Sequence, residues 1–300
     1  KELIPQMEEP RINPRLPGAI LPEGLKLSGD YGCVSGCPLV VMASPSFPMR
    51  SVCRGVAPHL DADAVVVSVT KGLENGTHLR MSQVVAETTG KEVVALTGPS
   101  HAEEVSLDIP TGLLAACEDQ ALAEFVQDAF MSEHLRVYTS ADPVGAELGA
   151  ALKNVIALCA GICDGLGHGD NTKAMLMTRG LTELARLGVA MGANKDTFTG
   201  LSGVGDLIVT CTSMHSRNRR AGILIGQGKD VQTAMKEVGA VVEGYYAAKS
   251  AWQLAQKMGV EMPITEAAYK VLYEGMSAAE MTHNLLMRRK KAESEDAGWL

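Results

Sequence analysis

The sequence predicts an α/β protein in which a doubly wound parallel sheet is followed by an all-helical domain. Short apolar runs of strand length alternate with helical patterns up to about residue 140, and strand patterns disappear after Pro143. The apolar runs are continuous, which is typical of strands covered on both faces. The 300 residues exceed what one hydrophobic core usually supports, so we expect two domains, one at 1–140 that contains the sheet and one at 141–300 that is all-helical.

The expected elements of the first domain follow one another in a simple order. Residues 1–8 resemble the end of a helix, and the prolines at positions 10, 14, 17 and 22 then predict an extended connection. Strands are expected at 38–43, 64–69, 92–96, 111–115 and 135–138, with helices at 79–88 and 120–130. This alternation of strand and helix is what predicts a parallel sheet.

The second domain is expected to contain helices alone. Asp170 and Asp230 are expected to cap two of them, Gly275 to close another, and Ser277 with Glu280 to form a capping box on the last. The expected helices are 143–163, 171–191, 216–226, 230–238, 243–258, 264–274 and 277–289.

Composition narrows the class of protein. A formal charge of -8 argues against a general nucleic-acid binder or a binder of anionic membranes, because both need a basic surface. We find no uninterrupted apolar run that could span a bilayer and no signal-peptide pattern, so we expect a cytoplasmic protein. The seven cysteines form no CxxC pair and leave one over in any disulfide scheme. Reduced thiols and no metal site are therefore expected.

The stretch 147–163 is the most informative in the chain. It has helical length and is apolar nearly all round, which indicates a helix buried on most of its surface. Lys153 and Asn154 interrupt it. A buried ammonium group needs a partner, a wet cleft or a lowered pKa, which makes Lys153 a candidate acid/base residue. The alternative is a lysine whose stem packs while its head reaches solvent.

Polar residues follow three of the expected strands. In parallel sheets, ligands bind at the carboxyl ends of the strands. In this sequence the expected strands are followed there by the loops 44–48, 70–74 and 97–102. Lys71 offers a positive charge, the glycines allow close backbone approach, and Ser100 offers a hydroxyl. Each loop alone could be an ordinary turn, but the three together indicate a binding site.

Two further motifs lie in the helical domain. Asp206 follows a glycine-rich loop, with Thr210 one turn later, and could be either a site residue or only a helix cap. Residues 216–220, Ser-Arg-Asn-Arg-Arg, open an expected helix, where backbone amides, the helix dipole and guanidinium groups suit a phosphate. The alternative for these arginines is a solvated face.

Seven motifs together resemble the bacterial type of NAD(P)-dependent glycerol-3-phosphate dehydrogenase, and the resemblance runs from about residue 8 to 290. No single motif would be specific, but their combination and order are. The motifs are Lys71-Gly-Leu-Glu74, Gly98-Pro-Ser100, Leu152-Lys-Asn154, Gly203-Val-Gly-Asp206, Ser216-Arg-Asn-Arg219, Val241-Val-Glu-Gly244 and Pro263-Ile-Thr265.

The resemblance implies a role for each matched residue. Lys153 would be the general base that takes the proton from the C2 hydroxyl of glycerol 3-phosphate, or returns it to the alkoxide of dihydroxyacetone phosphate, and Asp206 would orient it. The implied substrate contacts are Lys71, Gly98, Ser100, Lys153, Asp206, Ser216, Arg217 and Asn218. The implied contacts to NAD or NADP are Lys71, Ala102, Arg217, Val241 and Glu243.

The resemblance also implies properties of the whole protein, and this sequence departs from the family at one point. It implies a Rossmann-like sheet, a homodimer, and supply of glycerol 3-phosphate for phospholipid synthesis. The G-x-G-x-x-G strand-helix-strand segment that opens the family is absent, so we expect a truncated sheet that binds its cofactor poorly and is less stable than a complete one. The alternatives are a dehydrogenase of the 3-hydroxy acid or 6-phosphogluconate type, and a non-catalytic remnant that binds phosphometabolites.

Overall fold

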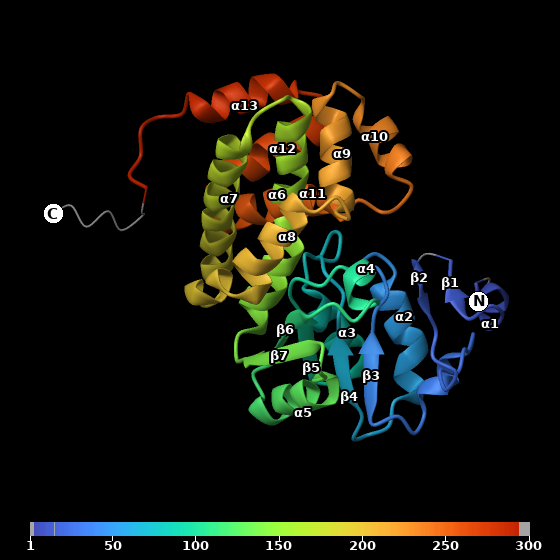
Figure 1. Ribbon diagram of the computed structural model, residues 1–300. Coiled ribbons are helices and arrows are strands. Elements are labelled where there is room, and N and C mark those ends of the chain that lie inside the picture. Colours follow the sequence, from blue (N-terminus) through green and yellow to red (C-terminus); the bar gives the residue numbers. More distant parts are fainter. Residues whose placement is uncertain (1–2, 15, 294–300) are drawn as a thin grey trace.

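A five-stranded sheet and a group of helices meet along one long helix, α6 (Pro143–Gly165), in this computed structural model, which describes residues 3–14 and 16–293 (Figure 1). The last strand ends at Ser140, and the segment after Pro143 contains no strand within the described residues. The expected order of a sheet followed by helices is therefore confirmed.

The sheet has all five expected strands. Their order across the sheet is β3 (Leu39–Met42), β4 (Val65–Ser68), β5 (Val93–Thr97), β6 (Thr111–Ala116) and β7 (Leu135–Ser140). β3, β4 and β5 pair in parallel, as do β6 and β7. The carboxyl ends of β3, β4 and β5 therefore lie at one edge, as the sequence predicted.

The β5–β6 pair is antiparallel, which differs from the expected all-parallel sheet. A parallel return needs a crossover of a dozen or more residues, usually a full helix. The connection between these strands contains only the one-turn helix α4 (Ala102–Val105), which is too short to cross a face of the sheet. The chain turns back instead, so β6 and β7 run opposite to the first three strands.

Hydrophobic clusters on both faces of the sheet explain why the strands read as continuous apolar runs. Within β4, Val66 packs into one cluster with Met81, and its neighbour Val67 packs into another with Val126. The helices that cover the sheet are α2 (Met49–Val56), α3 (Met81–Thr89) and α5 (Gln120–Phe130). The last two confirm the expected helices, whereas α2 was not predicted.

The chain before the sheet contains a small hairpin where an extended connection was expected. After α1 (Ile4–Glu8), the strands β1 (Ile12–Asn13) and β2 (Leu16–Ile20) pair antiparallel. Proline fixes φ near the extended range, so the prolines predicted extended backbone correctly but could not predict that two extended pieces would pair.

The helical region matches the expected helices closely. Asp230 caps α10 (Val231–Val238) and Ser277 caps α13 (Ala278–Leu286), by accepting hydrogen bonds from Thr233 N and Glu280 N. The Asp170 cap was wrong, because Gly169 is the N-cap and Asp170 lies in the first turn. The helices are α7 (Asp170–Ala190), α8 (Asp206–Thr212), α9 (Arg217–Gly226), α10 (Val231–Val238), α11 (Glu243–Met258), α12 (Pro263–Tyr273) and α13 (Ala278–Leu286), with short helical turns at Tyr31–Val34, Ala57–His59, Lys195–Thr199 and Leu201–Gly205.

Helix α6 connects the two regions and is buried along most of its length. Glu147 accepts hydrogen bonds from Ser82 N at 2.8 Å and from Arg80, which fixes the start of α6 to α3. Farther along, α6 packs tightly against α9, since a Cβ on Gly222 would lie 2.1 Å from the Leu158 carbonyl oxygen. Among the described helices only α6 is long and apolar enough to span a bilayer, and 94% of its apolar window is buried inside the protein.

Candidate active site

Lys153 is buried at the centre of α6, with 4% of its surface exposed. Its Nζ donates hydrogen bonds to the Asp206 carboxylate and to Thr210 Oγ1, the latter at 2.6 Å. The alternative in which the amine reaches solvent is therefore wrong. Both partners lie on α8, one turn apart, so this short helix presents a carboxylate and a hydroxyl to the same amine.

Asp206 joins Lys153 to a second lysine. One carboxylate oxygen accepts from Lys153, and the other accepts from Lys71 Nζ at 2.8 Å. Lys71 also donates to the Gly98 carbonyl oxygen at 2.8 Å. The helix-cap alternative for Asp206 is wrong, since Gly205 is the N-cap and the carboxylate binds the lysines. The residues Lys71, Lys153 and Asp206 are called the lysine cluster below.

The environment of the lysine cluster weakens the hold of Lys153 on its proton. Burial lowers the pKa of Lys153 to about 7, and repulsion from Lys71 acts in the same direction. Asp206 opposes both effects by attracting the charged amine. A lysine with a pKa near the working pH can both accept and donate a proton, which is the property that acid/base catalysis requires.

The loop after β5 lies beside the lysine cluster. Gly98 has a φ of +138°, and a Cβ there would lie 3.0 Å from the Gly112 carbonyl oxygen, so only glycine suits this position. The Gly98 carbonyl accepts from Lys71 and also from Ser100 Oγ at 3.1 Å. Burial and the charge of Lys153 lower the pKa of His101, which leaves its imidazole neutral at pH 7. Ala102 begins α4 and is exposed.

A chain of hydrogen bonds through two asparagines connects three helices next to the lysine cluster. Asn154 Oδ1 accepts from Asn218 Nδ2 at 2.9 Å, and Asn218 Oδ1 accepts from Gly244 N at 2.8 Å. Both asparagines are buried. Their amides are thus oriented by the fold, and α6, α9 and α11 are held in fixed relation where they meet.

The start of α9 combines the features that suit an anion. Ser216 is the N-cap and accepts from Arg219 N at 3.2 Å, and Arg217 and Asn218 follow in the first turn. Arg217 is exposed, and its guanidinium forms no hydrogen bond or ion pair with any residue of 3–14 or 16–293. Arg219 turns away and pairs with Asp164 at 2.8 Å. The sequence therefore grouped three arginines that the structure separates.

Three more loops meet at the carboxyl ends of β3 and β4. Ser46 Oγ donates to Glu243 Oε2 at 3.3 Å, and burial raises the pKa of that carboxyl. Gly72 has a φ of +135°, and a Cβ there would lie 3.0 Å from Ser46 Cβ, so the loops after β3 and β4 approach closely. Val241 is half-buried just before α11, which begins at Glu243.

The structure brings the expected site residues together around the lysine cluster, the start of α9 and the carboxyl ends of β3, β4 and β5. It also places there four residues that were not among the expected substrate or cofactor contacts. These are Thr210, Asn154, Ser46 and His101. The sequence carried a signal for Asn154, which interrupts an apolar helix beside Lys153, and for Thr210, one turn from Asp206. Ser46 and His101 lie in two of the strand-end loops that the sequence indicated, but the contact of Ser46 with Glu243, at the start of α11, could not be predicted.

Two family models match the chain. One is described as the N-terminus of NAD-dependent glycerol-3-phosphate dehydrogenase and matches residues 1–123, and the other is described as its C-terminus and matches residues 142–283. A glycerol-3-phosphate dehydrogenase [NAD(P)+] of Clostridium perfringens is 55% identical over 263 residues, covering 87% of this chain and 79% of that relative. One of the same name from Desulfitobacterium hafniense is 49% identical, covering 97% and 83%. The crystal structure of a Coxiella burnetii glycerol-3-phosphate dehydrogenase superposes with a TM-score of 0.91 at 36% identity, covering 96% and 89%.

Proposed function

This chain belongs to the NAD-dependent glycerol-3-phosphate dehydrogenase family, and from that premise we propose that Lys153 is the general base of a reversible oxidation of sn-glycerol 3-phosphate to dihydroxyacetone phosphate. The observation that carries the proposal is the lysine cluster, in which a buried amine has a pKa near 7 beside a polar, glycine-lined edge of the sheet.

The proton transfer follows from the state of Lys153. In the oxidation direction the neutral amine accepts the proton of the C2 hydroxyl as the hydride leaves C2. In the reverse direction the protonated amine donates to the oxygen that develops negative charge on C2. Thr210 and Asp206 fix the position of the amine. A fixed position lowers the barrier to proton transfer, in addition to the effect of a pKa near the working pH.

We assign the phosphate group of the substrate to the start of α9. Ser216, Arg217 and Asn218 lie there, where the helix dipole and free amide groups attract negative charge. The Arg217 guanidinium can grip two phosphate oxygens at once. Lys71, Gly98 and Ser100 would face the rest of the substrate from the loops after β4 and β5.

The carboxyl ends of the strands fit a nicotinamide dinucleotide. Ser68 and Thr97, the last residues of β4 and β5, each have a buried hydroxyl without a hydrogen-bond partner among the described residues. Gly72 lets the loop after β4 approach Ser46 in the loop after β3, so the two loops close together at this edge of the sheet. The nicotinamide, when bound, accepts the C2 hydride or returns it. The residues we assign to the cofactor are Lys71, Ala102, Arg217, Val241 and Glu243.

Three finer points are also proposals. Residues 1–140 would hold the dinucleotide and 141–300 the substrate, because the Ser46 and Gly72 loops belong to the first part and the α9 start to the second. A cytoplasmic homodimer that supplies glycerol 3-phosphate for phospholipid synthesis is what membership of the family favours. Sedimentation of the purified protein would test the dimer.

The decisive experiment compares the unchanged protein with two variants, Lys153→Met and Lys229→Met. Each purified protein is given glycerol 3-phosphate or a 3-hydroxy acid, with NAD⁺ or NADP⁺, and turnover is followed by the absorbance of the reduced nicotinamide. Lys153→Met should lower kcat for glycerol 3-phosphate by roughly 100- to 10,000-fold, because it removes the general base while keeping an unbranched apolar stem in the buried position. Lys229→Met is the matched control, since Lys229 pairs with Glu237 on the surface. Oxidation of the 3-hydroxy acid alone, or equal loss in both variants, would contradict the proposal.

A further inference from the structure

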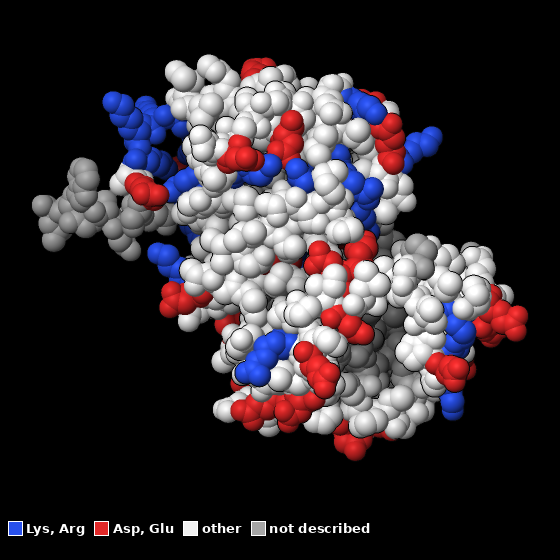
Figure 2. Space-filling model, in the orientation of Figure 1, with Lys and Arg blue, Asp and Glu red and all other residues white. Residues whose placement is uncertain are grey.

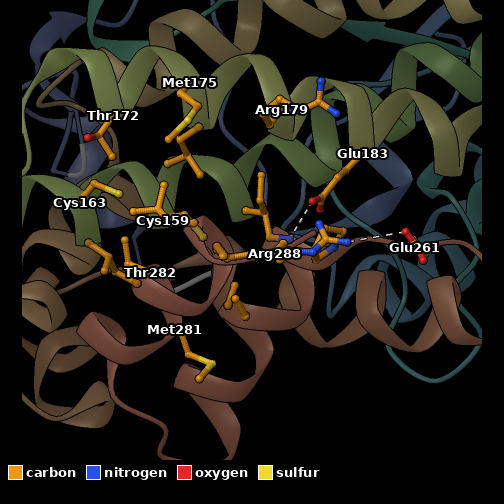
Figure 3. A pocket seen from close by; sticks show the side chains of 18 of the residues that line it. Cys159, Cys163, Thr172, Met175, Arg179, Glu183, Glu261, Met281, Thr282 and Arg288 are labelled. Carbon is orange, nitrogen blue, oxygen red and sulfur yellow. Dashed lines mark hydrogen bonds and ion pairs between the residues drawn. The ribbon is translucent and has the colours of Figure 1, made fainter. Parts of the chain in front are cut away.

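A second cavity lies in the helical region, and its volume is about 410 Å³. It is enclosed by α6, α7, α12, α13 and the residues that follow α13 (Figure 3). None of the lysine cluster or of the α9 start lines it. Its volume falls in the range of sites that take small organic ligands. The cavity is therefore a candidate binding site separate from the one assigned above.

One end of the cavity is apolar. Figure 3 shows Cys163, Thr172, Met175 and Thr282 gathered at this end, on helices α6, α7 and α13. Most of the remaining wall is aliphatic or small. It is formed by Ile162, Leu176, Ile264, Ala267, Ala268, Val271, Met281 and Leu285.

The opposite end is basic. Along one face of α7 the lining changes from Met175 and Leu176 to Arg179, and along α13 and beyond from Leu285 to Arg288. The cations at this end are Arg179, Arg186, Arg288, Arg289 and Lys291, and the carboxylates of the wall are Glu183, Glu261 and Glu293. Cations exceed carboxylates here although the whole chain carries a formal charge of -8. Figure 2 shows Lys and Arg side chains gathered where the chain leaves α13.

Two of the three carboxylates of the wall already have partners. Glu183, which Figure 3 shows between Arg179 and Arg288, accepts from Ile264 N at 2.8 Å and from Thr265 N at 3.2 Å, so both its oxygens serve the start of α12. Glu261 pairs with Lys291 at 2.7 Å and with Arg288 at 3.7 Å. Arg289 forms no ion pair within the part of the chain that the structure describes. Positive charge thus remains available to a ligand.

We propose that this cavity binds a free long-chain carboxylate, with its alkyl chain along the wall of Met175, Leu176 and Leu285 and its head group among Arg179, Arg288 and Arg289. An aliphatic wall stabilises a chain by removing methylene groups from water. The excess of guanidinium groups attracts an anionic head and repels a cationic one. A molecule that is apolar at one end and anionic at the other matches both ends of the cavity.

Equilibrium dialysis of the full chain against straight-chain carboxylates from octanoate to tetradecanoate, each below its aggregation concentration, tests the proposal. Dodecanoate should bind saturably at one site per chain, and each added methylene should tighten binding by roughly 4-fold until the cavity is full. Dodecylammonium, with the same chain and the opposite charge, should bind at least about 10-fold more weakly. Absence of saturable binding, or equal affinity for the two head groups, would overturn the proposal.

Two variants test the location of the site. Ala267→Phe fills the cavity from α12 and should abolish dodecanoate binding while the far-ultraviolet circular dichroism is kept. The double change Arg288→Gln with Arg289→Gln should weaken binding by roughly 2- to 10-fold. Lys195→Gln with Lys236→Gln, two exposed lysines outside the cavity, is the charge-matched control and should bind as the unchanged chain does. Undiminished binding to the filled variant, or equal effects of the double change and its control, would place the carboxylate elsewhere.

Discussion

Lys71 and Lys153 come from different regions of the fold, yet they donate to the two oxygens of a single buried carboxylate, that of Asp206. Two amines therefore share one counter-ion, and the carboxylate and the Lys153 amine are both buried. Lys71 raises the energy of the charged form of Lys153, and Asp206 lowers it. The balance leaves Lys153 able to exchange a proton near neutral pH.

The first prediction concerns the pH dependence of turnover. With the neutral Lys153 amine as the proposed base, kcat/KM for glycerol 3-phosphate oxidation should rise with pH through about 7, and reduction of dihydroxyacetone phosphate should fall over the same range. Asp206→Asn removes the attraction that holds the proton on Lys153, so the rising limb should move to lower pH. Asp164→Asn, which changes a carboxylate in the last turn of α6 that pairs with Arg219, should leave the limb in place. A limb that stays near 7 in the Asp206 variant would contradict this account.

The second prediction concerns the asparagine chain. Asn218→Ala removes the donor to Asn154 and the acceptor for Gly244 N, leaving buried groups unpaired. Denaturant unfolding should show a loss of about 1–3 kcal/mol, and KM for glycerol 3-phosphate should rise because Asn218 lies in our phosphate site. Gln232→Ala, on the exposed face of α10, should change neither quantity. Loss of stability with an unchanged KM would limit Asn218 to a structural role.

The third prediction concerns Glu183. Burial raises the pKa of this carboxyl to about 7, above the ordinary value of 4.5, so the folded chain binds a proton more tightly than the unfolded one. The contribution of the protonated Glu183 carboxyl to the free energy of unfolding is fully present below about pH 4.5 and is lost as the pH rises through 7. Relative to Glu183→Gln, the unchanged protein should therefore lose up to about 3 kcal/mol of unfolding free energy between pH 4.5 and 8. Glu266→Gln, at an exposed pair on α12, should follow the unchanged protein, and parallel curves for all three would refute the shift.

The fourth prediction tests the contact between α6 and α9. Gly222→Ala would bring a Cβ within 2.1 Å of the Leu158 carbonyl oxygen, so the helices must separate. Thermal unfolding should show a cost of about 1–3 kcal/mol or more. Gly24→Ala is the control, since nothing lies within 4 Å of its added Cβ. Equal stability of the two variants would show that the helices adjust freely.

The sequence predicted the strands and helices well because each kind of burial leaves its own pattern of apolar residues. A strand covered on both faces is a continuous apolar run, and a helix with one buried face has apolar residues every three or four positions. The reversal at β6 was missed because the general alternation of strands and helices predicted a parallel sheet, although no helix was expected between 96 and 111, where a parallel crossover would need one. The candidate site shows the same limit. Lys153 was found because a charge inside an apolar helix is costly, but its link to Lys71 depends on how the sheet meets α8. The cavity of the helical region escaped the sequence entirely, since its lining comes from four helices and each reads as ordinary core.

The continuity of α6 restricts how this enzyme can open and close. Its first turns are tied to α3 through Glu147, its middle carries Lys153, and its later turns are held against α9. A motion that moved the loops after β3 and β4 away from the start of α9 would leave the length of α6 unchanged. Because Lys153 and the contact with α9 belong to this one helix, the backbone that carries the amine would keep its place relative to α9 while those loops moved.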